Sequence, residues 1–308
     1  MKKILINITI IIMSIIIPSN VYALATTTAT EPIDTTKNGH LTLKYSYDDY
    51  NFDDTTVSIY YIASVTSDFQ YQLSSTYANY SIEVNGIKTN QDWNSLEQTL
   101  NAYIEADSIK ATLSKVITNN TIKLENLKPG LYFIKTNKID TKDYTLLFDE
   151  FLISIPNLNE DGTWNYNVTV NPKAEEYTPK YEKIKYTTLK EWIDSGKKRP
   201  ESIDIDIYED GILVESTKLS NDNNWTYEWI TDDDGSNWTV VERNIPEGYK
   251  VSILNQKRNF IIINKDSNYQ EENPKTLDDI KLYFYIFMGS LIGLILLAIS
   301  IFKNNKNN

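Results

Sequence analysis

The stretch KEWIDSGKKRPESIDIDIYEDG, Lys190 to Gly211, decides how the second half of this 308-residue chain folds. Within it, Ile203, Ile205 and Ile207 alternate with polar residues, which is the period of a strand that buries one face. The pair Asp210-Gly211 that follows is typical of a hairpin turn. Further short strands and turns continue downstream, so we expect an antiparallel β-sandwich in this half of the chain.

Three polar residues of this half stand where strand alternation predicts a buried side chain. Lys190, Glu242 and Asn264 each fall in step with the apolar residues of their own strand segments. Because unpaired polar groups in an apolar interior are costly, we expect the three side chains to satisfy one another. Burial lowers the pKa of a lysine and raises that of a carboxylic acid.

These three residue types can together form an amide cross-link. A neutral Lys190 amine attacks the Asn264 carboxamide, Glu242 polarises the carboxamide and relays protons, and ammonia leaves. The Lys190–Asn264 isopeptide bond would close a loop of about 75 residues. By analogy with a disulfide loop of that size, it would contribute about 4–5 kcal/mol of stability. The alternative is a surface Lys–Glu pair with an unrelated Asn.

Composition limits the classes of function. The chain carries 42 acidic and 30 basic residues, a formal net charge of −12, so it has no basic footprint for nucleic acid. It has no cysteine, which excludes disulfides, thiolate metal sites and cysteine catalysis. The single histidine, His40, removes most histidine-based catalysis and zinc chemistry. No carboxylate pair stands in a recognisable catalytic setting. We therefore expect no metal, no cofactor and no enzyme activity beyond one self-directed turnover.

The N-terminal end has the pattern of a secretory signal peptide. A short basic segment, an apolar run and a small-residue exit fill residues 1–23, which predicts cleavage after Ala23, with Ala25 as the alternative site. The other interpretation is an uncleaved membrane anchor, although the apolar run is short for a span. Residues 24–38 are rich in Thr and Ala without periodicity and predict a flexible leader.

The C-terminal end carries a candidate membrane segment. Residues 282–302 contain no charge and are long enough to cross a bilayer, which needs about 20 residues. The basic residues Lys303 and Lys306 follow, which predicts a cytoplasmic tail. We therefore expect an exported, extracellular chain that is held at a membrane or cell wall by its C-terminus.

A short polar motif precedes this segment. The order of polar motif, apolar span and basic tail resembles a sortase sorting signal, whose usual motif is Leu-Pro-x-Thr-Gly. Pro274 and Thr276 match that motif, whereas Asn273 and Leu277 depart from it and leave the class of sortase open; Lys275 is the variable position. The resemblance implies cleavage after Thr276 and transfer of the new carboxyl group to an amine. The alternative is an ordinary turn before a plain membrane anchor.

The first half of the chain predicts another β domain, over residues 39–173. Several short segments alternate as strands, and one helix is expected in residues 91–109, with Asn90 as its candidate cap. An apolar stripe on that helix is expected to pack in the core: Trp93, Leu96, Leu100, Tyr103 and Ile104. Many short strands with one inserted helix predict a β-sandwich-like domain.

The end of this domain resembles the N-terminal domain of sortase-assembled pilin subunits of Gram-positive bacteria. The residues that match the pilin motif Trp-x-x-x-Val-x-Val-Tyr-Pro-Lys-Asn are Trp164, Val168, Val170, Pro172 and Lys173. The resemblance implies that Lys173 is the amine that attacks the sortase-bound neighbouring subunit. Asn171 and Ala174 stand where the family has Tyr and Asn. The alternative is therefore that Lys173 is an ordinary exposed lysine at a domain boundary.

The second half resembles the Cna B-type domain of surface proteins and pilins. The residues that carry this resemblance, in order, are Lys190, Trp192, Gly196, Arg199, Pro200, Asn224 to Tyr227, Glu242, Pro246, Gly248, Tyr249 and Asn264. The match spans the whole domain. One acidic turn, Thr231 to Asn237, lies outside the motif, and we expect it to be a solvated hairpin rather than a calcium site.

Together these patterns predict an all-β chain of two tandem immunoglobulin-like (Cna B-type) β-sandwich domains, the first with an inserted helix, followed by a C-terminal transmembrane helix. The expected segments are a signal peptide (1–23), a flexible leader (24–38), an N-terminal pilin-like β domain (39–173), a linker (174–182), a Cna B-type domain (183–266), a sorting-signal region (267–281), a transmembrane segment (282–302) and a basic cytoplasmic tail (303–308).

The function expected from these segments is that of a structural or adhesive, pilin-like protein of the Gram-positive surface, anchored by sortase. Its expected partners are sortase, peptidoglycan or other pilin subunits, and a host ligand that the sequence does not name. The alternative is a monomeric surface adhesin or stalk that is held by its transmembrane helix and does not polymerise.

Overall fold

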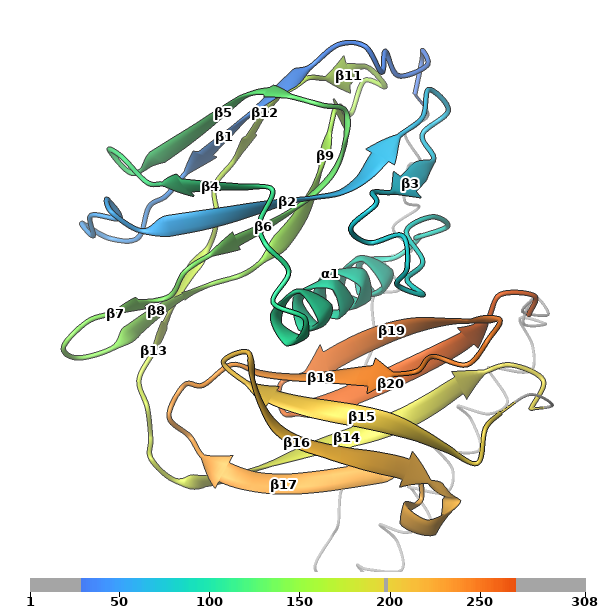
Figure 1. Ribbon diagram of the computed structural model, residues 1–308. Helices are drawn as coiled ribbons and strands as arrows, with labels where there is room; N and C mark the ends of the chain where they lie inside the picture. Colours follow the sequence, from blue (N-terminus) through green and yellow to red (C-terminus); the bar gives the residue numbers. More distant parts are fainter. Residues whose placement is uncertain (1–28, 197–198, 270–308) are drawn as a thin grey trace, which may run out of the picture.

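The computed structural model describes residues 29–196 and 199–269 (Figure 1). The predictions made for Ala23, for the Asn273–Leu277 motif and for residues 282–302 lie outside these residues. Within them, no helix is long and apolar enough to cross a membrane. The described part of the chain consists mostly of β-strands with one α-helix, which confirms the predicted β character and the inserted helix.

Two facing sheets build the N-terminal domain. The larger sheet has the order β3-β2-β6-β9, with β4 also paired to β2. Its strands are β2 (Thr56–Val65), β3 (Tyr71–Leu73), β4 (Leu113–Val116), β6 (Gly130–Thr136) and β9 (Phe151–Ile155). The smaller sheet has the order β12-β1-β5 and contains β1 (Gly39–Lys44), β5 (Thr121–Leu127) and β12 (Asn167–Val170). Leu41 and Leu43 of β1 share one buried core with Ile59 of β2 and Ile134 of β6.

The structure differs from the sequence at both boundaries of this domain. Ile33 is buried and its N–H bonds to the Ser67 carbonyl at 2.9 Å, so the segment predicted as a flexible leader is anchored to the domain at this residue, while the other residues from 29 to 38 are exposed. A single Ile among Thr residues gives no periodicity to detect. Residues 174–177 of the predicted linker form β13 (Ala174–Tyr177), because β8 (Thr145–Phe148) offers it a free edge.

Three minor strands complete the domain. The strand β7 (Ile139–Asp140) pairs with β8, and β10 (Asn157–Leu158) pairs with β11 (Trp164–Asn165). These short pairs extend the domain at its two ends (Figure 1).

The predicted helix is α1 (Asn90–Ala106). Its N-cap is Thr89 rather than Asn90, since the Thr89 hydroxyl and the Asp92 carboxylate form a reciprocal capping box. Leu96, Leu100, Tyr103 and Ile104 of the predicted stripe are buried, and Trp93 is partly buried. The helix lies between the larger N-terminal sheet and the second domain (Figure 1), so the stripe packs in a core that both domains share.

The second domain is a sandwich of a four-stranded and a three-stranded sheet. Their orders are β17-β14-β20-β19 and β16-β15-β18. The strands are β14 (Lys183–Ile193), β15 (Ser202–Glu209), β16 (Ile212–Ser220), β17 (Thr226–Asp232), β18 (Trp238–Arg243), β19 (Tyr249–Gln256) and β20 (Asn259–Asp266), with a 3-10 turn at Asn221–Asn223. Ile203, Ile205 and Ile207 are buried as predicted. Asp210 and Gly211 form the predicted turn, both with positive φ.

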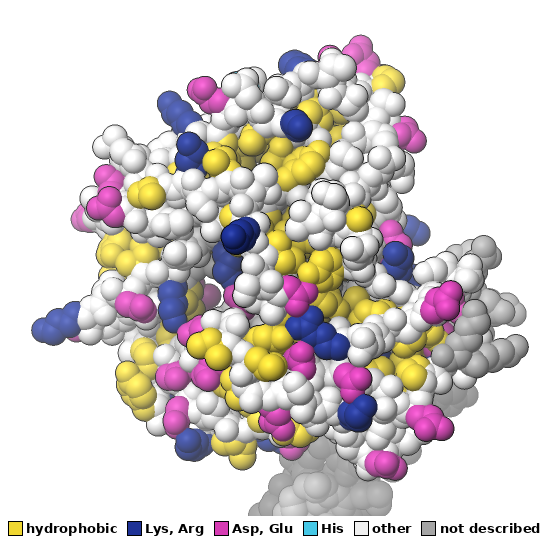
Figure 2. Space-filling model, viewed as in Figure 1, with side chains coloured by type: hydrophobic (Ala, Val, Ile, Leu, Met, Phe, Trp, Pro, Cys, Tyr) yellow, Lys and Arg dark blue, Asp and Glu magenta, His cyan; other side chains and the backbone are white. Residues whose placement is uncertain are grey.

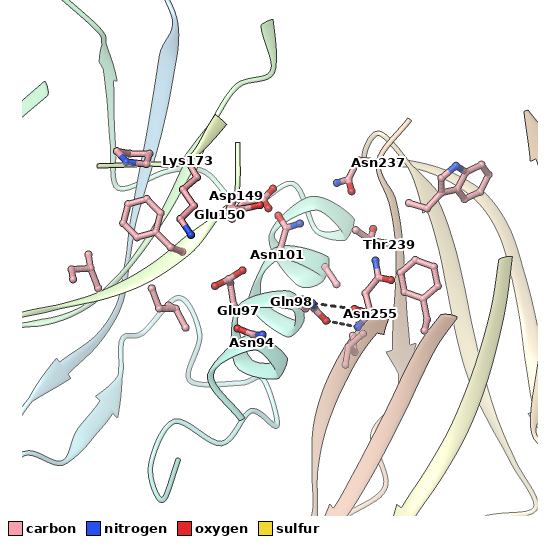
Figure 3. Close-up of a pocket in the computed structure, with 18 of the residues that line it drawn as sticks. Asn94, Glu97, Gln98, Asn101, Asp149, Glu150, Lys173, Asn237, Thr239 and Asn255 are labelled. Atoms are coloured by element: carbon pink, nitrogen blue, oxygen red, sulfur yellow. Dashed lines mark hydrogen bonds between the residues drawn. The ribbon is translucent and has the colours of Figure 1, made fainter. Parts of the chain in front are cut away.

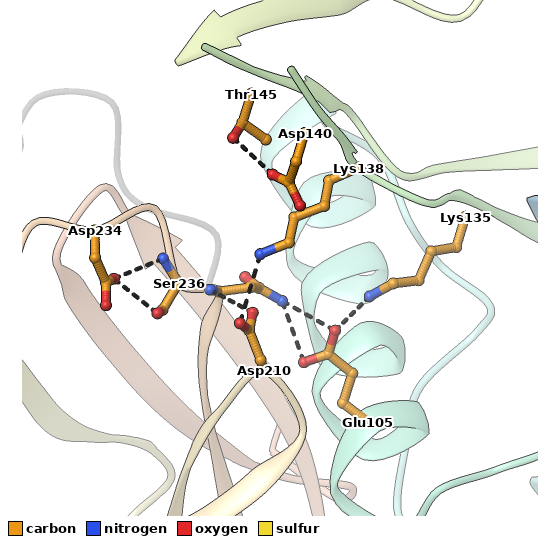
Figure 4. A network of polar contacts seen from close by, with 9 residues as sticks. Glu105, Lys135, Lys138, Asp140, Thr145, Asp210, Asp234 and Ser236 are labelled. Carbon is orange, nitrogen blue, oxygen red and sulfur yellow. Dashed lines mark hydrogen bonds and ion pairs between the residues drawn. The ribbon is translucent and has the colours of Figure 1, made fainter. Parts of the chain in front are cut away.

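Polar contacts join the two domains beside the helix (Figure 4). The Asn237 amide donates to Glu105 of α1 at 2.9 Å, and Lys138 lies 3.5 Å from the Asp210 carboxylate. The connector is also held, because Tyr177 donates its hydroxyl to Asp233. The acidic turn is thus only in part the solvated hairpin that the sequence predicted, since Asp233 is buried.

The surface charge agrees with the acidic composition. On the face of the described residues shown in Figure 2, Lys and Arg side chains lie among Asp and Glu side chains and form no continuous basic surface.

Candidate functional site

The structure brings Lys190, Glu242 and Asn264 together inside the second domain. Lys190 on β14 and Asn264 on β20 lie in neighbouring parallel strands, in which Asn264 is opposite Trp192. The two side chains are therefore one same-face step apart, within reach of each other. Glu242 comes from β18 in the facing sheet. All three residues are buried, with exposures of 4%, 1% and 0% for Lys190, Glu242 and Asn264.

Glu242 lies in contact with both partners. The Asn264 Nδ2 atom donates to Glu242 Oε1 at 2.8 Å, and the Lys190 Nζ atom lies 3.4 Å from Glu242 Oε2. The Lys190 amine also donates to the backbone oxygens of Glu191 at 3.0 Å and Ile262 at 3.3 Å. Asn264 Oδ1 has no hydrogen-bond partner among the described residues. The acid thus bridges the amine and the carboxamide.

Burial shifts the pKa values of Lys190 and Glu242 in the directions that favour the neutral form of each side chain. It lowers the pKa of Lys190 to about 8, although the nearby Glu242 carboxylate acts in the opposite direction. It raises the pKa of Glu242, against the effect of Lys190 and of the Asn264 hydrogen bond. A neutral amine beside a protonated acid is the form in which lysine is a nucleophile and glutamic acid is a proton donor.

An aromatic wall covers the amine. The Lys190 Nζ atom lies 4.3 Å from the centre of the Trp192 ring, and Trp192 packs edge-on against Trp225 and Tyr249. In the sequence, Trp192 was one of the residues that carry the Cna B-type resemblance, without a role of its own. Its position two residues from Lys190 is the signal that indicates this contact.

A second lysine of the described chain, Lys135, also lies beside an asparagine and a glutamate, but its pKa is shifted in the opposite direction. The Lys135 Nζ atom lies 2.8 Å from Asn101 Oδ1 and 3.3 Å from Glu150, and it also contacts Glu105. Burial alone would lower the pKa of Lys135, but Glu150 and Glu105 outweigh burial and raise it. A charged ammonium group is not a nucleophile, so this cluster is an ion-pair network and the Lys190 cluster differs from it.

The structure does not bring Lys173 to this set. Lys173 is exposed in the connection between β12 and β13 and lines a cleft of about 690 Å³ beside α1. In Figure 3 its side chain points toward the side of α1 that carries Glu97, and Asp149 and Glu150 line the same cleft. Burial, together with the charges of Glu150 and Asp149, raises the pKa of Glu97 to about 8.

Metal binding finds no support in residues 29–196 and 199–269, where no group of three His, Cys, Asp or Glu side chains could hold an ion. In the acidic turn, the buried residue Asp233 accepts one hydrogen bond from the Tyr177 hydroxyl and contacts Arg258 at 3.5 Å. These are structural contacts that hold the connector.

Comparison with known proteins identifies the second domain. Residues 186–265 match the Cna protein B-type domain family, which confirms the resemblance seen in the sequence. The chain is 30% identical over 120 residues to a collagen adhesin of Staphylococcus aureus, over 35% of this chain and 10% of that protein. It therefore spans about a tenth of the length of this relative.

Solved structures of surface proteins are also similar to the chain. A single B repeat unit of the collagen-binding surface protein of Staphylococcus aureus is 17% identical, with 75% of this chain and 98% of that chain covered and a TM-score of 0.26. The full-length major pilin SpaD of Corynebacterium diphtheriae is 16% identical, with 76% and 65% covered and a TM-score of 0.29. Scores this low do not establish a common fold over the whole chain.

Proposed function

We propose that the Cna B-type domain of this chain staples itself with a Lys190–Asn264 isopeptide bond, and that the chain is a structural or adhesive protein of a Gram-positive cell surface. The observation that supports the bond is the fully buried contact of a lysine, a glutamic acid and an asparagine on three different strands. Such a set is costly to bury and becomes favourable to the fold once it has reacted.

The reaction is an amide exchange in which all atoms balance. The neutral Lys190 Nζ attacks the Asn264 Cγ. With the Asn264 amide turned so that Oδ1 instead of Nδ2 faces Glu242, the protonated acid donates to Oδ1 and polarises the carboxamide. The Nζ–Cγ bond forms and the Cγ–Nδ2 bond breaks. Glu242 relays one proton from Nζ to the leaving nitrogen, which departs as ammonia. The domain reacts once, because the product amide no longer contains a free amine.

The bond would stabilise the fold by lowering the conformational entropy of the unfolded state. It closes a loop of about 75 residues in a chain that has no cysteine, which corresponds to about 4–5 kcal/mol in the chain-entropy description of a disulfide. An amide bond does not depend on redox conditions. This suits a protein that works outside the cell and bears load along its chain.

The cellular setting rests on the sequence. The signal peptide, the Asn273–Leu277 motif and the span at residues 282–302 favour export followed by sortase cleavage after Thr276. Lys173 is then the proposed amine for joining subunits, which its exposure permits. The matched relative is a collagen adhesin, which favours an adhesive role on host tissue. A monomeric stalk held by its membrane helix is the second candidate, since two positions beside Lys173 depart from the pilin motif.

Intact-mass measurement tests the bond. The purified chain is expected to weigh one ammonia less than its sequence, and Asn264→Ala is expected to have its full sequence mass. A wild-type chain of full mass would refute the proposed cross-link. Polymerisation is tested separately on cell-wall extracts: a ladder on denaturing gels that disappears in Lys173→Ala supports a pilin, whereas a single band in the wild type supports the monomeric stalk.

A further inference from the structure

Helix α1 of the N-terminal domain closes one open side of the second domain. The strands β18 and β19 are edge strands of the two facing sheets, and α1 lies against both of them (Figure 1). Tyr103 and Leu100 of the helix belong to the same buried core as Val240 of β18 and Ile253 of β19. The interior that holds the reacting set is therefore bounded on this side by the other domain.

The helix side chains take the place of a further strand along β19. The Ile253 N–H donates to Thr99 Oγ1 at 2.7 Å, and the Ile253 carbonyl accepts from Ser95 Oγ at 3.2 Å. Two residues further on, Gln98 accepts from the Asn255 N–H and donates to its carbonyl, as the dashed lines in Figure 3 show. Buried backbone groups without hydrogen-bond partners would be costly. The helix side chains supply these partners to β19 and so fix the position of α1 against the second domain.

One helix residue reaches the acid of the reacting set. The Tyr103 hydroxyl donates to the backbone oxygen of Glu242 at 2.9 Å, and Tyr103 is only 4% exposed. The next residue, Arg243, forms an ion pair with Asp107 at the end of the helix, at 2.8 Å. Among the described residues, β15 is the only strand that pairs with β18. On the other edge, these two contacts from α1 hold the backbone that carries the Glu242 carboxyl group.

We propose that Tyr103 is a positioning residue for the Lys190–Asn264 cross-link, so that the bond in the second domain forms at full rate only when the N-terminal domain is docked on it. The inference rests on the proposed function. The Glu242 carboxyl group must meet Lys190 and Asn264 at the same time, and a small shift of its backbone separates it from one of them.

The test compares Tyr103→Phe with wild type in the full chain. The chain is made by cell-free synthesis, samples are quenched in acid at intervals, and the fraction lacking one ammonia is measured by intact mass at several pH values. Tyr103→Phe keeps the ring packing and deletes one hydrogen bond, so we expect a reaction about five-fold slower per folded molecule. Folding is scored separately by tryptophan fluorescence.

The pH profile distinguishes positioning from a general loss of folded protein. A displaced Glu242 carboxyl group raises the pKa of Lys190 less, so the Lys190 limb of the profile would move to lower pH in Tyr103→Phe, whereas fewer folded molecules would lower the rate equally at every pH. Glu191 and Asp194, on the Lys190 strand and just after it, also act on the Lys190 charge, and the substitution leaves both in place.

Tyr132→Phe is the matched control. Tyr132 is also 4% exposed and donates its hydroxyl to a backbone oxygen, that of Lys128 at 2.7 Å, but it lies in the separate core of the N-terminal domain. We expect its reaction rate to equal the wild-type rate. Equal slowing in both variants would assign the effect to a general loss of stability and overturn the role of Tyr103.

Two outcomes separate this inference from the proposed function. A wild-type chain that never loses ammonia removes the cross-link itself. A wild-type chain that loses ammonia, with Tyr103→Phe at the same rate and with the same pH profile, overturns only the positioning role. If Tyr103→Phe does not fold, Asp107→Asn replaces it, because it weakens the adjacent contact to Arg243; a wild-type rate in that variant overturns the inference equally.

Discussion

The Lys190 Nζ atom lies 3.4 Å from Glu242 Oε2, and neither side chain has any exposed surface. At this separation and without water, the neutral amine and the protonated acid compete with the charged pair, because burial penalises both charges. The same contact would form a salt bridge on a protein surface, whereas burial here favours the neutral pair that the proposed reaction requires. The pH dependence of that reaction follows from the direction of the two pKa shifts.

The rate of ammonia loss is expected to pass through a maximum with pH. The reaction needs the amine without its proton and the acid with its proton, so the rate is highest between the lowered pKa of Lys190, about 8, and the raised pKa of Glu242. The limb of the profile that reports Lys190 should therefore lie near pH 8, and beyond it the rate should change about tenfold per pH unit. Cell-free synthesis into buffers of different pH, followed by intact mass, measures the profile. A rate that rises steadily with hydroxide concentration would contradict the assignment.

Only one cross-link is expected, in spite of the second lysine beside an asparagine. Lys135 contacts Asn101 as closely as a reacting pair would, yet its two carboxylate neighbours raise its pKa and keep it charged. We therefore predict that Lys135→Ala retains the mass deficit of one ammonia and that Lys190→Ala loses it. A deficit of two ammonia molecules in the wild type, reduced to one in Lys135→Ala, would show that the charged state does not protect Lys135.

Strand alternation was sufficient to predict that Lys190, Glu242 and Asn264 are buried. Each of Lys190, Glu242 and Asn264 alternates in step with buried apolar neighbours on its own strand. This alternation depends only on the local sequence, so it holds however the strands are arranged in the sandwich. The role of Tyr103 could not be predicted in this way. Its place in the helical stripe predicts burial, but the surface on which the stripe packs depends on how two domains dock, and no local period encodes that.

The two predicted boundaries differ from the structure for a related reason. The strand β13 forms because β8 provides an edge about thirty residues earlier in the chain, and Ile33 is buried because the domain offers a place for it. Neither segment has an apolar period of its own, so tertiary contacts alone give it structure.

Glu97 is expected to make the stability of the chain depend on pH. Its pKa is about 8 in the folded chain, raised by burial and then by the Glu150 and Asp149 charges, and it takes its ordinary, lower value when the chain unfolds. The folded state thus binds more protons than the unfolded state between these two values, so its contribution to stability falls as pH rises through that window. Glu97→Gln removes this effect and should raise the melting temperature relative to wild type at pH 9 but not at pH 5.

The control for that prediction is Glu160→Gln, which makes the same change in charge at an exposed position. We expect its melting temperature to follow the wild type at both pH values. Thermal unfolding followed by circular dichroism measures all three proteins. A Glu97→Gln variant that follows the wild type from pH 5 to pH 9 would show that the cleft does not hold Glu97 in its protonated form.

Gly235 connects the acidic turn to the domain connector, and its replacement tests that contact. A Cβ atom at Gly235 would lie 2.7 Å from the Tyr177 ring, and the Tyr177 hydroxyl bonds to the buried Asp233, so the ring cannot move without losing that bond. Gly248 has almost the same φ, +85° against +86°, but open space around it.

Both Gly→Ala variants carry backbone strain of about 1–3 kcal/mol. Gly235→Ala is expected to lose further stability, because it also disturbs the connector. Urea unfolding of the two variants in an Asn264→Ala background, without the cross-link, isolates the difference, and equal midpoints would mean that Tyr177 does not hold the turn.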